Sequence, residues 1–298
     1  MSRDQRAELA ALFPEGRVRF DEPMSSYSAI AAGGPAEAFV TVEDVGELKR
    51  AVGWAVERGV DFRFWGKGSA IIVRDRGVRG MILALGAGFD RAWIERASGE
   101  EVFVACHAAT AAQDVWRFCA GENLAGLDRL ASERGTVGGF LSASSVSEGD
   151  EPFPALEEMT ILTKDGKELT LRRSALRLEE GRIKIPRTSA IIRALFRLSR
   201  AGAVTEVKAA AAAEDMPQLQ GVFASPCRSA ASELIDDSGL AGVRVGGARV
   251  STGNSNTIVN HGNATVRDIA VLMNLIRDRV REQTGITLVP MIEVIGER

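Results

Sequence analysis

Hydrophobic residues recur at helical spacing in three stretches of the chain. They predict helices over 41–59, 111–122 and 265–285. The first begins at Thr41-Val42-Glu43-Asp44, which has the form of a capping box, and Gly59 ends it. The last is capped by Thr265 and Asp268, carries an apolar stripe and ends at Gly285.

Shorter apolar runs predict β-strands. They lie at 60–65, 70–73, 80–85, 101–105, 188–198 and 287–295, and a hairpin spans 156–171. Asp165-Gly166 supplies the turn of the hairpin, and Pro290 places the last strand at a sheet edge. In the run 188–198, apolar residues alternate with Arg193 and Arg197, so one face is predicted to be buried. Helices that alternate with strands indicate an α/β (α+β) fold.

Two glycine-rich loops interrupt this pattern. Gly66-Lys67-Gly68-Ser69 joins two predicted strands, and Gly135-Thr136-Val137-Gly138 precedes a run of small residues. Glycines let the backbone approach a phosphate closely, and Lys67 adds a positive charge. The first loop has neither the length of a P-loop nor the spacing of a dinucleotide-binding fingerprint. A phosphate cradle and an ordinary tight turn therefore both stay open.

Length and charge limit the class of protein. A chain of 298 residues with 45% hydrophobic content is expected to form two or three domains. The alanine-rich stretch 201–213 is the candidate linker, with a plain helix as the alternative. A net charge of −3 predicts neither nucleic-acid nor membrane partners, although a local basic pocket would still admit a small anion. The start lacks a signal-peptide pattern and no apolar run approaches the roughly 20 residues of a membrane span, so a cytoplasmic location is expected.

A metal site is not expected. Cys106, Cys119 and Cys227 lack the spacing of metal ligands, and the only histidines are His107 and His261. The cysteines are predicted to be reduced and mostly buried thiols.

Many short segments, in order along the chain, resemble one enzyme family. In the first two-thirds they are Gly33-Gly34-Pro35-Ala36, Gly66-Lys67-Gly68-Ser69, Val73-Arg74-Asp75, Gly77-Val78-Arg79-Gly80, Gly135-Thr136-Val137-Gly138-Gly139 and Arg187-Thr188-Ser189. In the last third they are Leu234-Ile235-Asp236, Val245-Gly246-Gly247-Ala248, Asn256, Ile258-Val259-Asn260, Ala264-Thr265 and Ile295-Gly296. No single segment is specific. Their order is similar to that of the UDP-N-acetylenolpyruvoylglucosamine reductase (UDP-N-acetylmuramate dehydrogenase) family of peptidoglycan precursor synthesis.

The resemblance implies a flavoprotein with NADPH as reductant. FAD would be held by residues 1–200, in two small α/β subdomains of about 1–85 and 86–200 like those of vanillyl-alcohol oxidase (PCMH-type). Residues 201–298 would form a C-terminal α/β domain that binds a small-molecule nucleotide-sugar, in a monomer or weak dimer. The cofactor-binding residues that the resemblance implies are Gly33, Gly34, Gly66, Lys67, Gly68, Ser69, Gly135, Thr136, Val137 and Gly138.

The resemblance also indicates which side chains would act on the substrate. In this family an arginine clamps the carboxylate of the enolpyruvyl group, and an acid protonates the carbon that becomes carbanion-like. Arg187 matches that arginine. Phe223 matches the phenylalanine of the family's substrate-binding segment, and Ser225 stands at the substrate-binding position where the family has an asparagine. The proton-donating serine, however, falls on Gly221, and the C-terminal glutamate falls on Met291. Neither glycine nor methionine can donate a proton.

Two nearby residues are candidates for displaced substitutes. Glu293 follows Met291 by two positions, which in a continuous strand places it on the same face about 7 Å further along. Ser225 follows the missing serine by a few residues. Catalysis falls steeply with such misplacement. Departures at Ala70, where the family has an asparagine, and at Glu148, an acid near the expected diphosphate, leave FAD retention open as well.

Three hypotheses follow. The first, by family relationship, is a divergent FAD- and NADPH-dependent reductase that uses substitute acids or a related substrate. The second, which the residues support better, is a non-catalytic paralogue that binds a nucleotide or nucleotide-sugar without reducing it. The third is a structural protein that binds neither flavin nor sugar.

Overall fold

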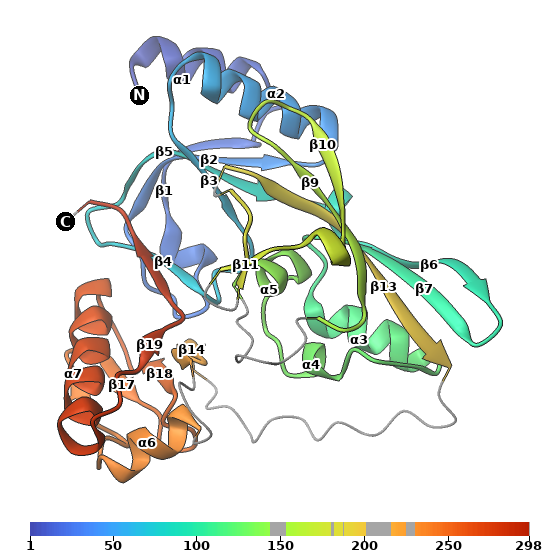
Figure 1. Cartoon of the computed structure of the whole chain (residues 1–298). Helices are drawn as coiled ribbons and strands as arrows, with labels where there is room; N and C mark the ends of the chain where they lie inside the picture. Colours follow the sequence, from blue (N-terminus) through green and yellow to red (C-terminus); the bar gives the residue numbers. More distant parts are fainter. Residues whose placement is uncertain (144–152, 180–181, 187, 201–215, 225–229, 298) are drawn as a thin grey trace. The chain divides into compact units, whose positions relative to one another are not determined.

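The computed structural model describes residues 1–143, 153–179, 182–186, 188–200, 216–224 and 230–297 (Figure 1). Arg187, Ser225, Glu148 and the candidate linker 201–213 lie outside these residues. The chain forms two compact units: unit 1 holds Met1–Phe20, Ala38–Gly66 and Gly80–Ala209, and unit 2 holds Asp21–Glu37, Lys67–Arg79 and Ala210–Arg298. The boundary passes through the glycine loop, between Gly66 and Lys67. The division into 1–200 and 201–298 stays a prediction.

The first sheet, mainly in unit 1, has the strand order β1-β2-β5-β3. Its strands are β1 (Val18–Pro23), β2 (Pro35–Val42), β3 (Phe62–Trp65) and β5 (Val78–Leu85), and α1 (Arg3–Ala11) and α2 (Val45–Glu57) share a core with it. The predicted capping box at 41–44 is wrong, because Thr41 and Val42 extend β2. Asp44 caps α2 instead, since its Oδ1 accepts the amide of Glu47 at 2.7 Å.

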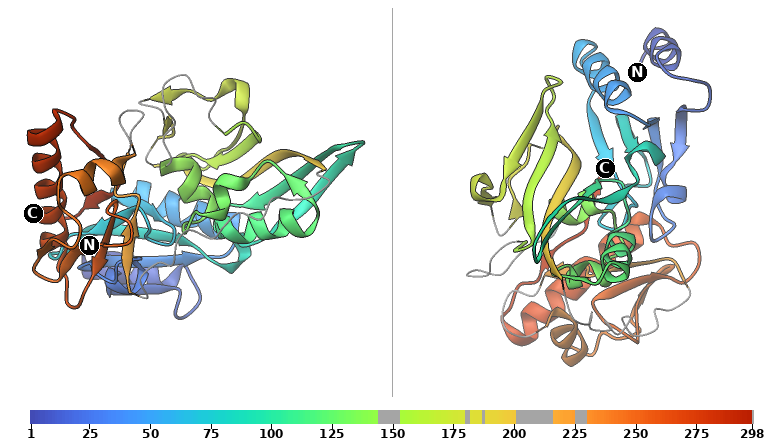
Figure 2. Two further views of the ribbon diagram at one scale, coloured as in Figure 1. Left: turned by 90° about the horizontal axis from the view of Figure 1, so that it is seen from below. Right: turned by 90° about the vertical axis from the view of Figure 1, so that its right-hand side faces the viewer.

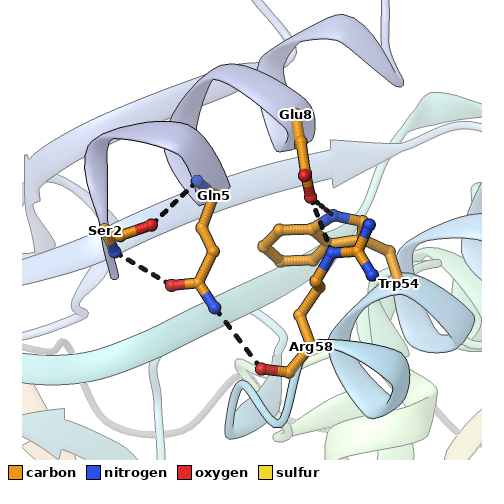
Figure 3. Close-up of polar contacts among 5 residues, drawn as sticks. All are labelled: Ser2, Gln5, Glu8, Trp54 and Arg58. Carbon is orange, nitrogen blue, oxygen red and sulfur yellow. Dashed lines mark hydrogen bonds and ion pairs between the residues drawn. The ribbon is translucent and has the colours of Figure 1, made fainter.

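Polar contacts attach α1 to α2 (Figure 3). Glu8 Oε2 accepts hydrogen bonds from Nε of Arg58 at 2.7 Å and from Nε1 of Trp54 at 3.4 Å. Ser2 and Gln5 form the capping box that begins α1, and the side-chain Nε2 of Gln5 also donates to the carbonyl of Arg58. These contacts fix the register of the first helix, which has few apolar residues of its own.

The second sheet of unit 1 is antiparallel, with the order β10-β9-β13-β7-β6 (Figure 2). Its strands are β6 (Ala92–Ser98), β7 (Glu101–His107), β9 (Leu156–Leu162), β10 (Glu168–Arg172) and β13 (Ala190–Arg200), and β8 (Leu124–Ala125) also pairs with β13. Helices α3 (Ala112–Gly121), α4 (Asp128–Ala131) and α5 (Val137–Ala143) share a core with one of its faces. The short elements η2 (Ala87–Phe89), η3 (Arg173–Ala175), β11 (Leu178–Glu179) and β12 (Arg182–Ile183) complete the unit. The predicted buried face of 188–198 is confirmed, since Ala194 and Phe196 are buried and Arg193 and Arg197 form ion pairs with glutamates. Leu195, between the two arginines, is buried as well.

Unit 2 contains a four-stranded sheet, β14-β18-β17-β16, and two helices (Figure 1). Its elements are η1 (Met24–Tyr27), β4 (Ile71–Val73), β14 (Gln218–Gln220), β15 (Phe223–Ala224), α6 (Ala231–Asp237), β16 (Arg244–Val245), β17 (Ala248–Val250), β18 (Thr257–Asn260), α7 (Val266–Thr284), β19 (Val289–Pro290) and β20 (Glu293–Ile295). The predicted helix 265–285 is confirmed as α7, with Thr265 and Asp268 as its capping box and Gly285 at its end. The predicted strand 287–295 is two strands, because β19 pairs with β15 whereas β20 pairs with β4.

The described cysteines, Cys106 and Cys119, are free and buried. Burial raises the pKa of the Cys106 thiol far above its ordinary value and raises the pKa of Cys119 to about 12. No group of three or more His, Cys, Asp or Glu side chains within the described ranges is placed to hold a metal ion. None of the helices in the described part of the chain has the length and apolar character needed to cross a membrane.

Candidate functional site

The loop that follows β3 presents free backbone N–H groups. Gly68 is buried with φ at 62°, and a Cβ there would lie 2.2 Å from the carbonyl oxygen of Tyr27, so only glycine fits. The Gly68 carbonyl accepts the amide of Ala29 at 3.0 Å. Within the described residues, no acceptor takes the amides of Lys67, Gly68 or Ser69, and Lys67 is exposed. The loop therefore fits an anion that accepts from the backbone.

The second glycine loop, in unit 1, has fewer free amides. The amides of Val137 and Gly138 donate to the carbonyls of Thr110 and Ala108, both at 2.9 Å. A Cβ on Gly66 would lie 3.0 Å from Oγ1 of Thr136, so the last unit 1 residue of the first loop lies against the second. Of the four predicted residues in this second loop, only Gly135 and Thr136 keep amides without an acceptor in the described structure.

Gly33 and Gly34 allow two backbone segments of unit 2 to pack closely. A Cβ on Gly34 would lie 2.4 Å from the carbonyl oxygens of both Arg74 and Asp75, and the Gly34 amide donates to Val73 O at 3.2 Å. A Cβ on Gly33 would lie 3.3 Å from the backbone of η1. Backbone packing thus accounts for both glycines, and their role in cofactor binding stays a prediction.

The two positions to which the resemblance assigns proton donors lie next to a pair of strands: Gly221 precedes β15 and Met291 follows β19. β15 and β19 pair antiparallel, with Phe223 opposite Pro290, and the amide of Met291 donates to the carbonyl of Val222 at 2.8 Å. Gly221, exposed with φ at 62°, directly precedes Val222, and a Cβ there would meet no atom within 4 Å. The structure therefore brings the Gly221 and Met291 positions together, far apart as they are in the sequence.

Glu293 lies beside Ala70, at the end of the candidate phosphate loop Lys67–Ser69, and it begins a strand separate from β19. Its amide donates to the carbonyl of Ala70 at 2.9 Å, and β20 continues in parallel register along β4. The chain bends at Ile292, so the expected same-face spacing from Met291 does not rest on one continuous strand. The Glu293 side chain is exposed, next to the residue that follows Ser69.

The side chain of Asn256 binds the segment that contains Gly221 and Phe223, on the side opposite β19. Its Oδ1 accepts the amide of Phe223 at 2.9 Å, and its Nδ2 donates to the carbonyl of Phe223 at 2.8 Å. Its own carbonyl accepts the amide of Val222 at 3.1 Å. One side chain thus satisfies both backbone groups of Phe223, as a neighbouring strand would.

Sequence reasoning missed these contacts of Asn256 and a similar role of Asp75. The carboxylate of Asp75 accepts the amides of Val266 and Arg267, at 2.8 and 3.0 Å. Both residues stand in segments that resemble the reductase family, but no local signal in the sequence indicates their partners.

Two parts of the chain match known domain families. Residues 36–172 match an FAD binding domain, and residues 213–295 match the C-terminal domain of UDP-N-acetylenolpyruvoylglucosamine reductase. The similarity therefore includes parts of both units.

Similar proteins extend over nearly the whole length. A UDP-N-acetylenolpyruvoylglucosamine reductase of Geobacter metallireducens is 32% identical, over 98% of this chain and 97% of that protein. UDP-N-acetylenolpyruvoylglucosamine reductase 2 of Bacillus cereus is 30% identical over 97% of this chain and 96% of its own length. The crystal structure of the reductase from Thermus caldophilus superposes with a TM-score of 0.75 at 26% identity, covering 91% of this chain and 97% of that one.

Proposed function

Because the chain belongs to the UDP-N-acetylenolpyruvoylglucosamine reductase family, we propose that it binds FAD and a nucleotide-sugar without completing the family's reduction. One observation carries the proposal: both missing proton donors map to a single place, where β15 and β19 pair. The loss therefore affects the whole acid machinery of that place rather than one isolated residue.

FAD fits the loop Lys67–Ser69. Three amides without acceptors, a buried left-handed glycine and an exposed lysine together suit a phosphate group. The match of residues 36–172 to an FAD binding domain supports the same cofactor. When bound and reduced, FAD would supply a hydride, with NADPH as the reductant that the family relationship implies.

The residues at the acid positions cannot supply the proton that must accompany a hydride. Gly221 has no side chain, and the thioether of Met291 carries no ionisable proton. The space beside Gly221 is open, so a ligand can approach the pair without being protonated by it. A bound nucleotide-sugar would therefore stay unreduced.

A reductase with a displaced acid is the second candidate. Its support is the position of Glu293, whose backbone lies beside Ala70 at the end of the cofactor loop. Its carboxyl group is the nearest acid in the sequence to Met291, and Ser225 is the corresponding candidate for the hydroxyl donor. Glu293→Gln removes this acid while leaving the length of the side chain unchanged.

The test begins with the flavin spectrum of the purified protein and its reduction by NADPH. Reoxidation is then followed with the enolpyruvyl nucleotide-sugar in the wild type, in Glu293→Gln, and in the double variant Gly221→Ser/Met291→Glu. Gly221→Ala/Met291→Gln is the matched control, because it has the same backbone strain at a positive φ and no acid.

We expect a yellow wild-type protein whose reduced flavin is reoxidised no faster with substrate than with buffer. The acid-bearing double variant should gain substrate-dependent reoxidation, and the control should not. Substrate-dependent turnover in the wild type would reject the proposal, and its loss in Glu293→Gln would establish the displaced acid. A colourless protein that takes up no added FAD would favour the structural role.

A further inference from the structure

The carboxylate of Asp75 caps the N-terminus of α7, the longest helix in the described residues, although Asp75 is not part of that helix. Its Oδ1 accepts the amide of Val266 at 2.8 Å, and its Oδ2 accepts that of Arg267 at 3.0 Å. The hydroxyl of Thr265 accepts a hydrogen bond from the next amide, that of Asp268. Because the first amides of a helix lack partners within it and carry positive partial charge, a carboxylate in this place is strongly held.

Asp75 lies six positions after Ser69, and the backbone between them is fixed within unit 2. The carbonyl of Ala70 accepts the amide of Glu293, and the amide of Arg74 donates to Ile295 O at 2.8 Å. Ile72, between them, is fully buried in the core that also contains the apolar stripe of α7. The absence of a Cβ on Gly34 lets that glycine pack against the carbonyls at 74–75.

The segment 70–75, which follows the candidate phosphate loop Lys67–Ser69, is therefore held mainly by C-terminal residues. The loop's own backbone accepts one described hydrogen bond from the N-terminal part of unit 2, from the amide of Ala29 to the carbonyl of Gly68, and Gly68 packs closely against the carbonyl of Tyr27. After the loop, each anchor up to Asp75 comes from β20, from Gly34 or from the first turn of α7. From the sequence, the loop is expected to belong to an N-terminal domain. In the structure, the segment directly behind it is held by contacts with residues between 265 and 295.

We infer that Asp75 is a positioning residue for cofactor binding: by holding α7, it fixes the segment behind Lys67–Ser69 and orders the three free amides before the ligand arrives. The inference rests on the proposed binding of FAD to this loop. By thermodynamic linkage, FAD and the docking of α7 then stabilise each other. In this role Asp75 acts through the first turn of α7 rather than by contacting the ligand.

Asp75→Asn tests this role with almost no change in shape. The Asn side chain keeps one acceptor but points its NH₂ group at the second helix amide. Thr265→Ala is the matched control, because it weakens the same helix end through its capping box while leaving the carboxylate of Asp75 on Val266 and Arg267. Two measurements are made on each full-length protein: the FAD dissociation constant by flavin fluorescence, and amide hydrogen exchange of residues 67–69 without FAD.

We expect Asp75→Asn to bind FAD about tenfold more weakly, because the loop must then be ordered on binding. Its loop amides should exchange faster than in the wild type. Thr265→Ala should lower thermal stability but leave both the dissociation constant and the loop exchange unchanged. A merely structural Asp75 would lower thermal stability in the same way, with neither of the two changes at the loop.

Unchanged loop exchange and unchanged FAD affinity in Asp75→Asn would overturn the inference. If the wild type binds no FAD, the proposed function fails instead. The exchange comparison between Asp75→Asn and Thr265→Ala still decides whether Asp75 orders the loop.

Discussion

Asn256 offers the sharpest test of how unit 2 holds its candidate substrate segment. The side chain accepts from the amide of Phe223 and donates to its carbonyl, at 2.9 and 2.8 Å. The side chain of Phe223 is itself almost fully buried in the core of unit 2, with 2% exposed. Asn256→Ala therefore leaves two backbone groups without partners on a segment that cannot move away.

The cost follows from these contacts. Each lost hydrogen bond is worth about 1 kcal/mol net, and leaving the partly buried amide and carbonyl of Phe223 unsatisfied raises the total to about 3 kcal/mol. Asn256→Asp should cost nearly as much at pH 7, because a carboxylate can accept from the amide but cannot donate to the carbonyl. Protonation restores a donor, so the folded state raises the pKa of the new carboxyl. The deficit should therefore shrink as the pH falls through that raised pKa, and it should be smallest below about pH 4, the ordinary value of an unfolded Asp.

Urea unfolding, followed by circular dichroism at 222 nm, gives the free energies. The matched control is Asn274→Ala, the same substitution at an exposed position of α7, which should stay within about 0.5 kcal/mol of the wild type. A loss below about 1 kcal/mol in Asn256→Ala would refute the clamp, because water would then replace the side chain at little cost. A pH-independent deficit in Asn256→Asp would show that the Nδ2 contact contributes nothing.

Two further predictions concern unit 1. Burial and the neighbouring Arg91 lower the pKa of His107, so the unfolded chain binds more protons below about pH 6.5 and stability should fall as the pH drops from 7 to 5. Urea unfolding of His107→Gln across this range should show a weaker pH dependence than the wild type, and an equal one would contradict the assignment. In a Cys227→Ser background, Cys106 and Cys119 should not react with a thiol reagent at pH 8 until urea unfolds the protein, because burial holds both thiols protonated. Prompt reaction of either thiol in the native protein would show that it is accessible.

Local patterns in the sequence predicted the parts of the fold that depend on local physics. The capping residues and apolar stripe of α7 lie within one segment, so its limits could be read directly. The alternation along β13 likewise identified one buried face, because a strand turns successive side chains to opposite faces. It did not indicate that Leu195, on the face of the two arginines, is buried as well, because that depends on the neighbouring strands. The capping box at 41–44 failed because the same residues also suit the end of a strand, and pairing within the sheet decided between the two.

Pairing between distant segments could not be predicted. The apolar run of β4 suits any sheet, and nothing in it indicates that its partner is β20, near the C-terminus. That pairing brings Glu293 to Ala70, and β15 with β19 brings Met291 to Val222. The resemblance to the reductase family named the individual positions of the site, whereas only the structure shows which of them meet.

The proximity of Gly221 and Met291 distinguishes two cases: an absence of proton-donating side chains, and an absence of the backbone structure that would hold them. Phe223 is buried, Asn256 holds its backbone, and Pro290 lies opposite it, so the frame that would carry two acids is intact. A frame that had decayed with its catalytic groups would leave restored acids without fixed positions. Because this frame persists, Gly221→Ser and Met291→Glu would place their oxygens on two neighbouring segments that are joined by the hydrogen bond from the Met291 amide to the Val222 carbonyl. The main cost of restoration is then the backbone strain of serine at φ 62°, about 1–2 kcal/mol, which a folded domain can absorb.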